Sequence, residues 1–202
     1  SGNFLALRED PINQIIPTEW VKAAMSRRVK YPISPESIPM CNIGCDVSGG
    51  GKDLVTLAPR YDWWYDDIRS FTSDDLFRNQ VDRNKYGRVI AANILTLVSD
   101  ESFITVDMGG GYGSGVYECL SSTVGMDGNR LRAYKGAEGS TLRTKDGMYG
   151  FTNTRTAALW KMREALDPSQ PGGSPVCLPD DKMLLSDLTA PTFEITPRGS
   201  QA

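Results

Sequence analysis

The sequence predicts an α/β fold in which a mixed sheet, three antiparallel strands followed by parallel strands, is flanked by helices. Two apolar runs each end in an aspartate followed by glycines: residues 42–51 read NIGCDVSGGG and residues 103–111 read FITVDMGGG. Short apolar runs closed by glycine are typical of buried strands. Residues 154–166 instead carry apolar side chains at helical spacing. Helices that alternate with buried strands indicate an α/β architecture.

Composition narrows the chemistry that the chain can perform. Its 202 residues suffice for one medium domain with an arm, and a charged content of 23% is ordinary for a globular chain. No apolar run approaches the roughly 20 residues of a membrane helix, so we expect no membrane association. The absence of histidine excludes Ser-His-Asp and Cys-His nucleophiles as well as Cys/His zinc sites. General base chemistry is therefore left to a carboxylate, a lysine or a metal-bound water.

Residues 1–40 have the composition of an N-terminal arm. Thr18 is a plausible N-cap for a short helix that runs to about Arg28. Pro32, Pro35 and Pro39 then disfavour regular structure. This pattern predicts a linker helix joined to something upstream, with the main domain in residues 41–202.

Three strands are expected next, in residues 43–47, 54–59 and 63–71, with a glycine turn before the second strand and a bend at Asp66 and Asp67 in the third. Their short connections predict an antiparallel meander. A helix over residues 74–99, capped by Asp74 or Asp75, follows. Gly87 is its weak point.

The second half of the chain alternates between strands and helices. We expect a fully buried strand in residues 103–106, a helix in 113–120 and a strand in 131–134. The glycine-rich residues around 139–150 predict a loop or hairpin. A helix in 154–166, a short helix in 180–187 and a final strand in 192–196 complete the series. This alternation implies parallel pairing through right-handed crossovers.

This order of elements resembles the ribonuclease-H-like fold, in which the first strand lies beside the fourth. Asp46 and Asp107 would then end neighbouring strands, close enough to bridge one cation or to flank two. Each aspartate could instead be a turn former or a helix cap. The glycine run after Asp107 also resembles the phosphate-binding turn of actin-like ATPases, so a nucleotide-binding fragment is the alternative function. A non-catalytic assembly module is a third hypothesis.

Charge is distributed unevenly along the chain. The net charge of −3 argues against a generic nucleic-acid binder. Residues 130–163, however, hold eight basic and two acidic side chains, a net charge of +6, whereas residues 44–75 hold three basic and seven acidic ones, a net charge of −4. A metal-dependent nuclease needs acids for cations and a basic face for phosphates. The candidate DNA contacts are Arg130, Arg132, Arg143, Lys145 and Arg155.

Several motifs in a fixed order resemble the nuclease domain of the large terminase subunit of tailed bacteriophages. The resemblance covers about residues 15–199. The matching segments are residues 16–21 (IPTEWV), 44–53 (GCDVSGGGKD), 104–116 (ITVDMGGGYGSGV), 153–155 (NTR), 160–166 (WKMREAL) and 184–191 (LLSDLTAP).

The resemblance implies a two-metal-dependent endonuclease that cuts concatemeric double-stranded DNA during genome packaging. Two Mg²⁺ or Mn²⁺ ions would be held by three acids, of which Asp46 is the first and Asp107 the second. The third is expected beyond Ala202, so that residues 41–202 would lack the C-terminal end of the domain. Asp187 lies upstream of the expected position, and Asp53 is only a fallback ligand.

The resemblance also implies partners. These are double-stranded DNA, an upstream ATPase domain of the same polypeptide, and in addition the portal and the small terminase subunit. The expected location is the cytoplasm of the infected bacterial host.

Overall fold

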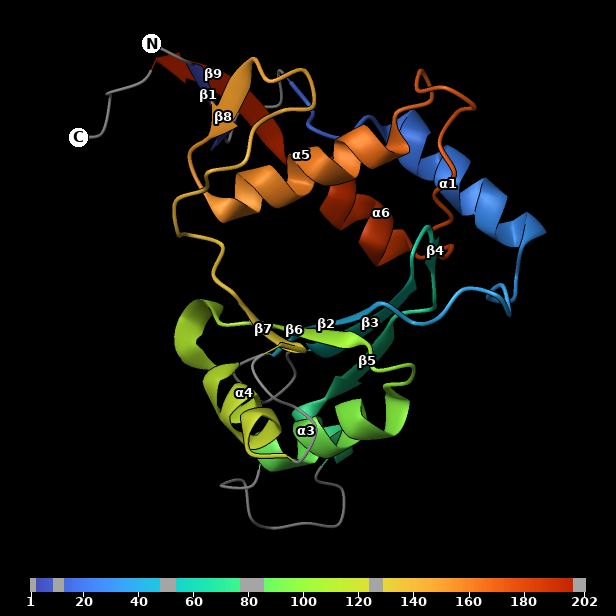
Figure 1. Cartoon of the computed structure of the whole chain (residues 1–202), viewed down its shortest axis with the longest axis vertical. Helices are drawn as coiled ribbons and strands as arrows, with labels where there is room; N and C mark the ends of the chain where they lie inside the picture. Colours follow the sequence, from blue (N-terminus) through green and yellow to red (C-terminus); the bar gives the residue numbers. More distant parts are fainter. Residues whose placement is uncertain (1–2, 9–12, 48–53, 77–85, 124–128, 198–202) are drawn as a thin grey trace. The chain divides into compact units, whose positions relative to one another are not determined.

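The computed structural model describes residues 3–8, 13–47, 54–76, 86–123 and 129–197. Contacts between residues divide the chain into two compact units (Figure 1). One unit is continuous and comprises Ile33–Lys135, and the other combines Ser1–Pro32 with Gly136–Ala202. This division does not test the predicted functional boundary between an arm in residues 1–40 and a nuclease domain in residues 41–202, which stays a prediction.

The continuous unit is built on a mixed sheet. In its described part the strand order is β4-β3-β2-β6-β7, with β5 also paired to β3. β2 pairs antiparallel with β3 and parallel with β6, which is in turn parallel to β7. The predicted ribonuclease-H-like order is confirmed, because the first predicted strand lies beside the fourth. The strands are β2 (Asn42–Asp46), β3 (Leu54–Tyr61), β4 (Trp64–Tyr65), β5 (Arg69–Thr72), β6 (Phe103–Asp107) and β7 (Leu131–Tyr134).

The predicted third strand, residues 63–71, is divided into β4 and β5. Asp66 accepts a hydrogen bond from the Asp67 backbone N–H at 2.8 Å and forms a 3.0 Å ion pair with Arg69. The carboxylate thus holds the irregular segment that separates β4 from β5, at the position where the sequence predicted a bend. Both strands still pair antiparallel with β3.

Two helices, α3 (Tyr86–Leu97) and α4 (Ser114–Ser121), cover one face of this sheet (Figure 1). Alternate strand residues point toward them, as the period of a β-strand requires. The opposite face carries the polar residues of the same strands. The core comprises Ile43, Cys45, Val55, Leu57, Ile104, Val106 and Leu131 from the strands with Ile90, Ala91, Ile94, Val116 and Leu120 from the helices.

The predicted helix over residues 74–99 is described as α2 (Ser73–Leu76) and α3, and residues 77–85 between them lie outside the described part of the chain. Gly87, predicted as a weak point, has a packing role. A Cβ atom there would lie 2.7 Å from the carbonyl carbon of Gly115, so only glycine permits the close approach of α3 to α4.

The second unit contains a small sheet of order β8-β1-β9 and three helices. β1 (Asn3–Arg8) runs parallel to β8 (Tyr149–Phe151) and antiparallel to β9 (Thr192–Pro197). Leu5, Phe151 and Ala157 form its small core with Trp160 and Phe193 packed alongside. The helices are α1 (Thr18–Lys30), α5 (Thr154–Leu166) and α6 (Lys182–Thr189).

The sequence prediction located these helices well but not all of their caps. α5 has the predicted bounds, and the Asn153 side chain accepts a hydrogen bond from Thr156 N at its N-terminus. The predicted Thr18 cap of α1 is wrong, because Pro17 occupies the N-cap position without a side-chain bond. No helix in the described ranges combines the length and the apolar character needed to cross a bilayer.

Candidate active site

Asp46 and Asp107 end two neighbouring strands. Parallel pairing of β2 with β6 joins Asn42 to Phe103 and continues in register to Cys45 and Val106. The next residues along the same register are Asp46 and Asp107. Paired strands lie about 4.8 Å apart, and residues in register point to the same face of a sheet. Both acids therefore lie at the same edge and on the same face, as the sequence predicted from the fold.

The strand pattern explains why these acids lie away from the core. Ile43 and Cys45 are buried on the helical face, which leaves Asn42, Gly44 and Asp46 on the other. Asp46 is exposed and Asp107 is half-buried. Asp46 pairs with Thr56 on β3, and Asp107 pairs with Tyr134 on β7. Across the four strands β3, β2, β6 and β7, the residues at this edge are therefore Thr56, Asp46, Asp107 and Tyr134.

The negative charges of Asp46 and Asp107 both influence the pKa of the Cys45 thiol. Burial, which is the largest cause, and the charges of Asp46 and Asp107 together raise the pKa of Cys45 to about 12. Two carboxylates that act on one thiol concentrate negative charge at one place in the fold. That concentration favours a cation at this edge of the sheet.

A glycine turn directly after β6 holds one oxygen of Asp107. Gly109 N donates a hydrogen bond to Asp107 Oδ1 at 2.8 Å, and Met108 N donates to the Tyr134 carbonyl at 2.9 Å. The short helix η2 (Gly109–Gly111) contains two residues, Gly110 and Gly111, at φ values of 70° and 80° that favour glycine. Asp107 thus forms the turn as well as presenting a carboxylate.

The turn gives little further support to the nucleotide-binding alternative. The N–H of Gly109 donates to Asp107, and the N–H of Gly111 donates to the Met108 carbonyl at 3.2 Å. Both amides therefore have partners within the turn. The nucleotide-binding alternative is still supported by the glycine-rich sequence that follows Asp107. The corresponding turn after Asp46, with the fallback ligand Asp53, lies outside the described residues.

The two carboxylates suit a hard divalent cation. Mg²⁺ prefers oxygen ligands and is commonly held by one or two carboxylates, with waters and substrate phosphates completing its shell. Among the residues that the structure describes, no group of three or more His, Cys, Asp or Glu side chains is placed to hold a metal. Asp46 and Asp107 supply two carboxylates of this kind, and Asp187 belongs to α6 in the second unit.

Two predicted DNA contacts, Arg130 and Arg132, belong to the continuous unit. The guanidinium of Arg130 donates to the Ser102 carbonyl, at 3.4 Å from Nε and 3.3 Å from Nη2. Arg132 is exposed, and its guanidinium carbon lies 4.2 Å from the centre of the Phe103 ring. Arg132 pairs with Thr105, two residues before Asp107. The structure thus places Arg132 on the same face as the acids.

The other three predicted contacts, Arg143, Lys145 and Arg155, belong to the second unit. Arg143 Nε donates to the Gly147 carbonyl at 2.9 Å, Lys145 N donates to Glu164 Oε2 at 2.7 Å, and Arg155 N donates to the Gly136 carbonyl at 3.0 Å. Backbone bonds fix Lys145 and Arg155 in place, and all three residues are exposed. A role in phosphate contact fits these three residues but has no further support in their geometry.

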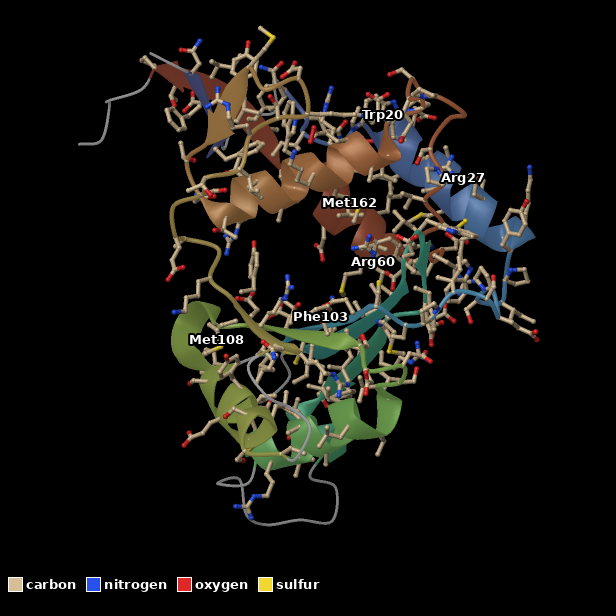
Figure 2. The ribbon with its side chains drawn as sticks, viewed as in Figure 1. Trp20, Arg27, Arg60, Phe103, Met108 and Met162 are labelled. Atoms are coloured by element: carbon tan, nitrogen blue, oxygen red, sulfur yellow. The ribbon has the colours of Figure 1, made fainter. Side chains whose placement is uncertain are left out.

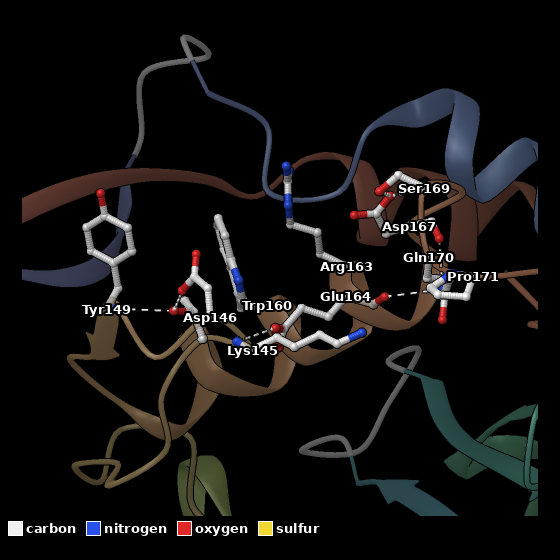
Figure 3. A pocket seen from close by; sticks show the side chains of 11 residues that line it. Lys145, Asp146, Tyr149, Trp160, Arg163, Glu164, Asp167, Ser169, Gln170 and Pro171 are labelled. Atoms are coloured by element: carbon white, nitrogen blue, oxygen red, sulfur yellow. Dashed lines mark hydrogen bonds between the residues drawn. The ribbon is translucent and has the colours of Figure 1, made fainter. Parts of the chain in front are cut away.

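A cavity of about 480 Å³ lies beside Lys145 in this unit (Figure 3). The Arg163 guanidinium lies 4.8 Å from the Trp160 ring centre, and its Nη1 donates to the Ile15 carbonyl at 2.7 Å. Glu164 accepts hydrogen bonds from Lys145 N and from Lys161 Nζ. These polar groups stabilise the unit itself.

Arg60 was missed by the sequence prediction. It lines a cavity of about 410 Å³ with Cys41, Asn42, Phe103, Thr105 and Arg132. Arg60 pairs with Asn42 across β3 and β2, so it shares the face that carries Asp46. The alternation of β3 could have indicated this face, but only the cross-strand register brings Arg60 near Phe103.

Comparison with known proteins supports the fold. No family model and no curated protein matches the chain. The chain is similar to the solved nuclease domain of the large terminase subunit gp2 of bacterial virus Sf6, at 18% identity and a TM-score of 0.59, over 91% of this chain and 87% of that one. Substituted forms of the same domain, solved with manganese and beta-thujaplicinol or with calcium, each match at 17% identity and a TM-score of 0.57, over 90% of this chain and 87% of theirs. The likeness shows that this chain has the ribonuclease-H-like fold of terminase nuclease domains.

Proposed function

We propose that this chain is the metal-dependent endonuclease domain of a phage large terminase and cuts concatemeric double-stranded DNA during genome packaging. The observation that carries the proposal is the in-register ending of β2 and β6 on Asp46 and Asp107. The fold of the terminase nuclease domains supports it, and the solved relatives that contain manganese or calcium are consistent with a divalent ion.

Each acid has a distinct role in this proposal. Asp46 is the bridging acid and Asp107 the second metal ligand. The Gly109 amide orients Asp107 through Oδ1, and the other carboxylate oxygen would be the one to hold an ion. Bound Mg²⁺ or Mn²⁺ would supply an activated water and neutralise charge on the phosphate. A second ion would need a third acid in addition to Asp46 and Asp107. Cys45 is buried in the core on the opposite face of β2 from Asp46, so it would not compete as a ligand.

Plasmid nicking with Mn²⁺ tests the proposal. We expect slow metal-dependent nicking that EDTA stops and that Asp46→Asn and Asp107→Asn both abolish. Asp187→Asn removes one exposed acid from α6 and is the matched control, which should leave nicking unchanged. Brisk cleavage by the Asp46→Asn variant would contradict the assignment. Binding of ATP in a calorimeter, without binding of duplex DNA, would favour the nucleotide-binding alternative.

The basic residues Arg130, Arg132, Arg143, Lys145 and Arg155 are proposed to contact the DNA backbone. Phosphate contacts carry no base code, which fits cleavage with weak sequence preference. Replacement of Arg143 and Lys145 by glutamine should make DNA binding less dependent on salt, because each lost contact reduces counterion release. A salt dependence equal to that of the unmodified chain would exclude these two residues from the interface.

The same proposal implies the setting in which the domain works. An upstream ATPase domain of the same polypeptide would drive DNA translocation, and the portal and the small terminase subunit would hold the motor in place. The proposed location is the cytoplasm of the infected bacterial host. Support for these partners comes from the resemblance to terminases and from the linker composition of residues 1–40.

A further inference from the structure

We propose that the cavity between Arg60 and Arg132 is a DNA phosphate-binding subsite, and that Phe103 positions Arg132 within it. This inference rests on the proposed function and names residues that would contact the DNA in addition to the metal-binding acids. The lining contains two guanidinium groups and no carboxylate. An electropositive cavity of about 410 Å³ on the face of the acids is suited to an anion.

The two arginines have no acidic partner within the described residues. Arg60 Nε donates to the Asp62 backbone carbonyl at 2.7 Å, and its guanidinium lies 5.3 Å from the Tyr65 ring centre. The guanidinium carbon of Arg132 lies 4.2 Å from the centre of the Phe103 ring. Both positive charges are thus held by neutral groups, and their Coulombic attraction is available to a ligand.

Phe103 is the platform that orients Arg132. Phe103 is 37% exposed, which is unusual for a phenylalanine at the start of a buried strand. A guanidinium stacks flat on such a ring while its N–H groups remain free at the edge to bind phosphate. On the floor of the cavity, Thr105 Oγ1 donates to Asn42 Oδ1 at 2.8 Å, which keeps these polar groups satisfied. Figure 2 shows Arg60 and Phe103 on the side of the sheet away from α3 and α4.

The spacing favours two phosphates rather than one. Arg60 and Arg132 lie on strands separated by β2 and β6, so about three strand spacings, or roughly 14 Å, separate their backbones. Each guanidinium is therefore assigned its own phosphate. Arg132 pairs with Thr105, and two further residues, about 7 Å of strand, lead to Asp107. The subsite would hold the DNA close to the acids.

The test is the salt dependence of binding to a 20-base-pair duplex in EDTA, where no cleavage occurs. Arg60→Gln and Arg132→Gln should each reduce the slope of log K against log salt by about 0.9, the value for one phosphate contact, and the double variant by about 1.8. Arg88→Gln on α3, exposed on the helical side of the sheet, removes the same charge and should leave the slope unchanged. A double variant with the slope of Arg88→Gln would overturn the proposal.

Two further variants separate positioning from charge. Phe103→Leu should lower the slope as Arg132→Gln does, because Arg132 loses its platform, and Arg132→Lys should fail to restore full affinity since an ammonium does not stack. Full affinity and an unchanged slope in Phe103→Leu would exclude the positioning role. Asp46→Asn should bind DNA in EDTA with an undiminished slope. If nicking fails the test of the proposed function while the arginine slopes change, the subsite stands and the nuclease assignment does not.

Discussion

Gly113 passes so close to Asp107 that a Cβ atom at position 113 would collide with the Asp107 carbonyl oxygen. The same atom would also lie 3.0 Å from Val106 Cγ1. The backbone of Gly113 has ordinary helical angles, with φ of −75°, so this glycine is required by space rather than by conformation. The start of α4 therefore packs directly against the end of β6, the strand that carries Asp107.

Gly113→Ala should therefore destabilise the protein and displace Asp107. We expect a loss of about 1–3 kcal/mol or more in the free energy of unfolding, as for other overpacked sites. Urea denaturation measures it. Gly115→Ala is the control, because a Cβ there meets only Gly87 Cα at 3.9 Å. That variant should be neutral or more stable by up to about 1 kcal/mol, since alanine is the better helix former.

The buried thiol of Cys45 should make stability fall at alkaline pH. Its pKa is raised from 9.0 to about 12 in the folded protein, first by burial and then by Asp46 and Asp107. Above pH 9 the unfolded chain loses the thiol proton while the folded chain keeps it. The stabilising contribution of the protonated Cys45 thiol is complete below pH 9. As pH rises toward 12 this contribution is lost, and the free energy of unfolding falls by up to about 1.4 kcal/mol per pH unit.

The comparison of Cys45→Ala with the unmodified chain isolates this effect. Urea denaturation between pH 8 and pH 11 should show a smaller decline for Cys45→Ala, whereas Cys119→Ala, which removes a half-buried thiol, should decline like the unmodified chain. Burial also raises the pKa values of Tyr61 and Tyr65, so part of the decline is common to all three proteins. Equal declines in all three would contradict the assignment to Cys45.

Arg163 should stabilise the second unit through packing rather than through an ion pair. Its guanidinium lies 5.0 Å from the Trp20 ring centre and 4.8 Å from that of Trp160, and it donates to the carbonyl of buried Ile15 at 2.7 Å. Arg163→Ala should cost about 2–4 kcal/mol by losing two cation–π contacts and one charge-assisted hydrogen bond. Tryptophan fluorescence during urea denaturation reports the change directly.

Two variants test whether the stacked geometry of Arg163 matters. Arg163→Lys keeps the charge but cannot stack as a plane, so it should recover less than half of the lost stability. Arg155→Ala, an exposed position on the same helix, should change stability by no more than about 0.5 kcal/mol. Full recovery by lysine would show that charge alone suffices.

Asn153 should be the side chain that starts α5. Its Oδ1 accepts from both Thr156 N and Thr156 Oγ1 at 2.9 Å, and Thr156 is fully buried. Asn153→Ala should cost about 1–2 kcal/mol, as other N-cap removals do, and Asn153→Asp should retain most of the stability. Thermal unfolding followed by circular dichroism distinguishes them, and equal melting temperatures for alanine and aspartate would exclude capping by this side chain.

The sequence predicted the continuous unit well because its signals are local. Each strand that was predicted there has an apolar alternation or run of its own, and a carboxylate or glycine marks its end. The parallel neighbours β2 and β6 follow from the element order, from which the sequence predicts that Asp46 and Asp107 end adjacent strands. Arg60 was not identified, because its closeness to Phe103 depends on register across three strands rather than on spacing along the chain.

The second unit was harder to predict for the same reason. β1 is a short strand whose partners begin at Tyr149 and Thr192, so nothing near it in the sequence reveals the pairing. In α5, Ala157 is buried and its neighbour Ala158 is exposed, a difference that helical spacing of apolar residues alone does not predict. A basic side chain also covers apolar surface of this helix, because the Arg163 guanidinium lies 4.8 Å from the centre of the Trp160 ring.

The interleaved connectivity of the two units has a consequence for synthesis on the ribosome. The sheet of Ile33–Lys135 closes over short stretches of chain, so its strands can pair as soon as they emerge. Asn3, by contrast, must wait for Pro197, its pairing partner at the far end of the described residues. The segment with the acids is therefore expected to mature early, while β1 stays without its β9 partner until β9 has been made.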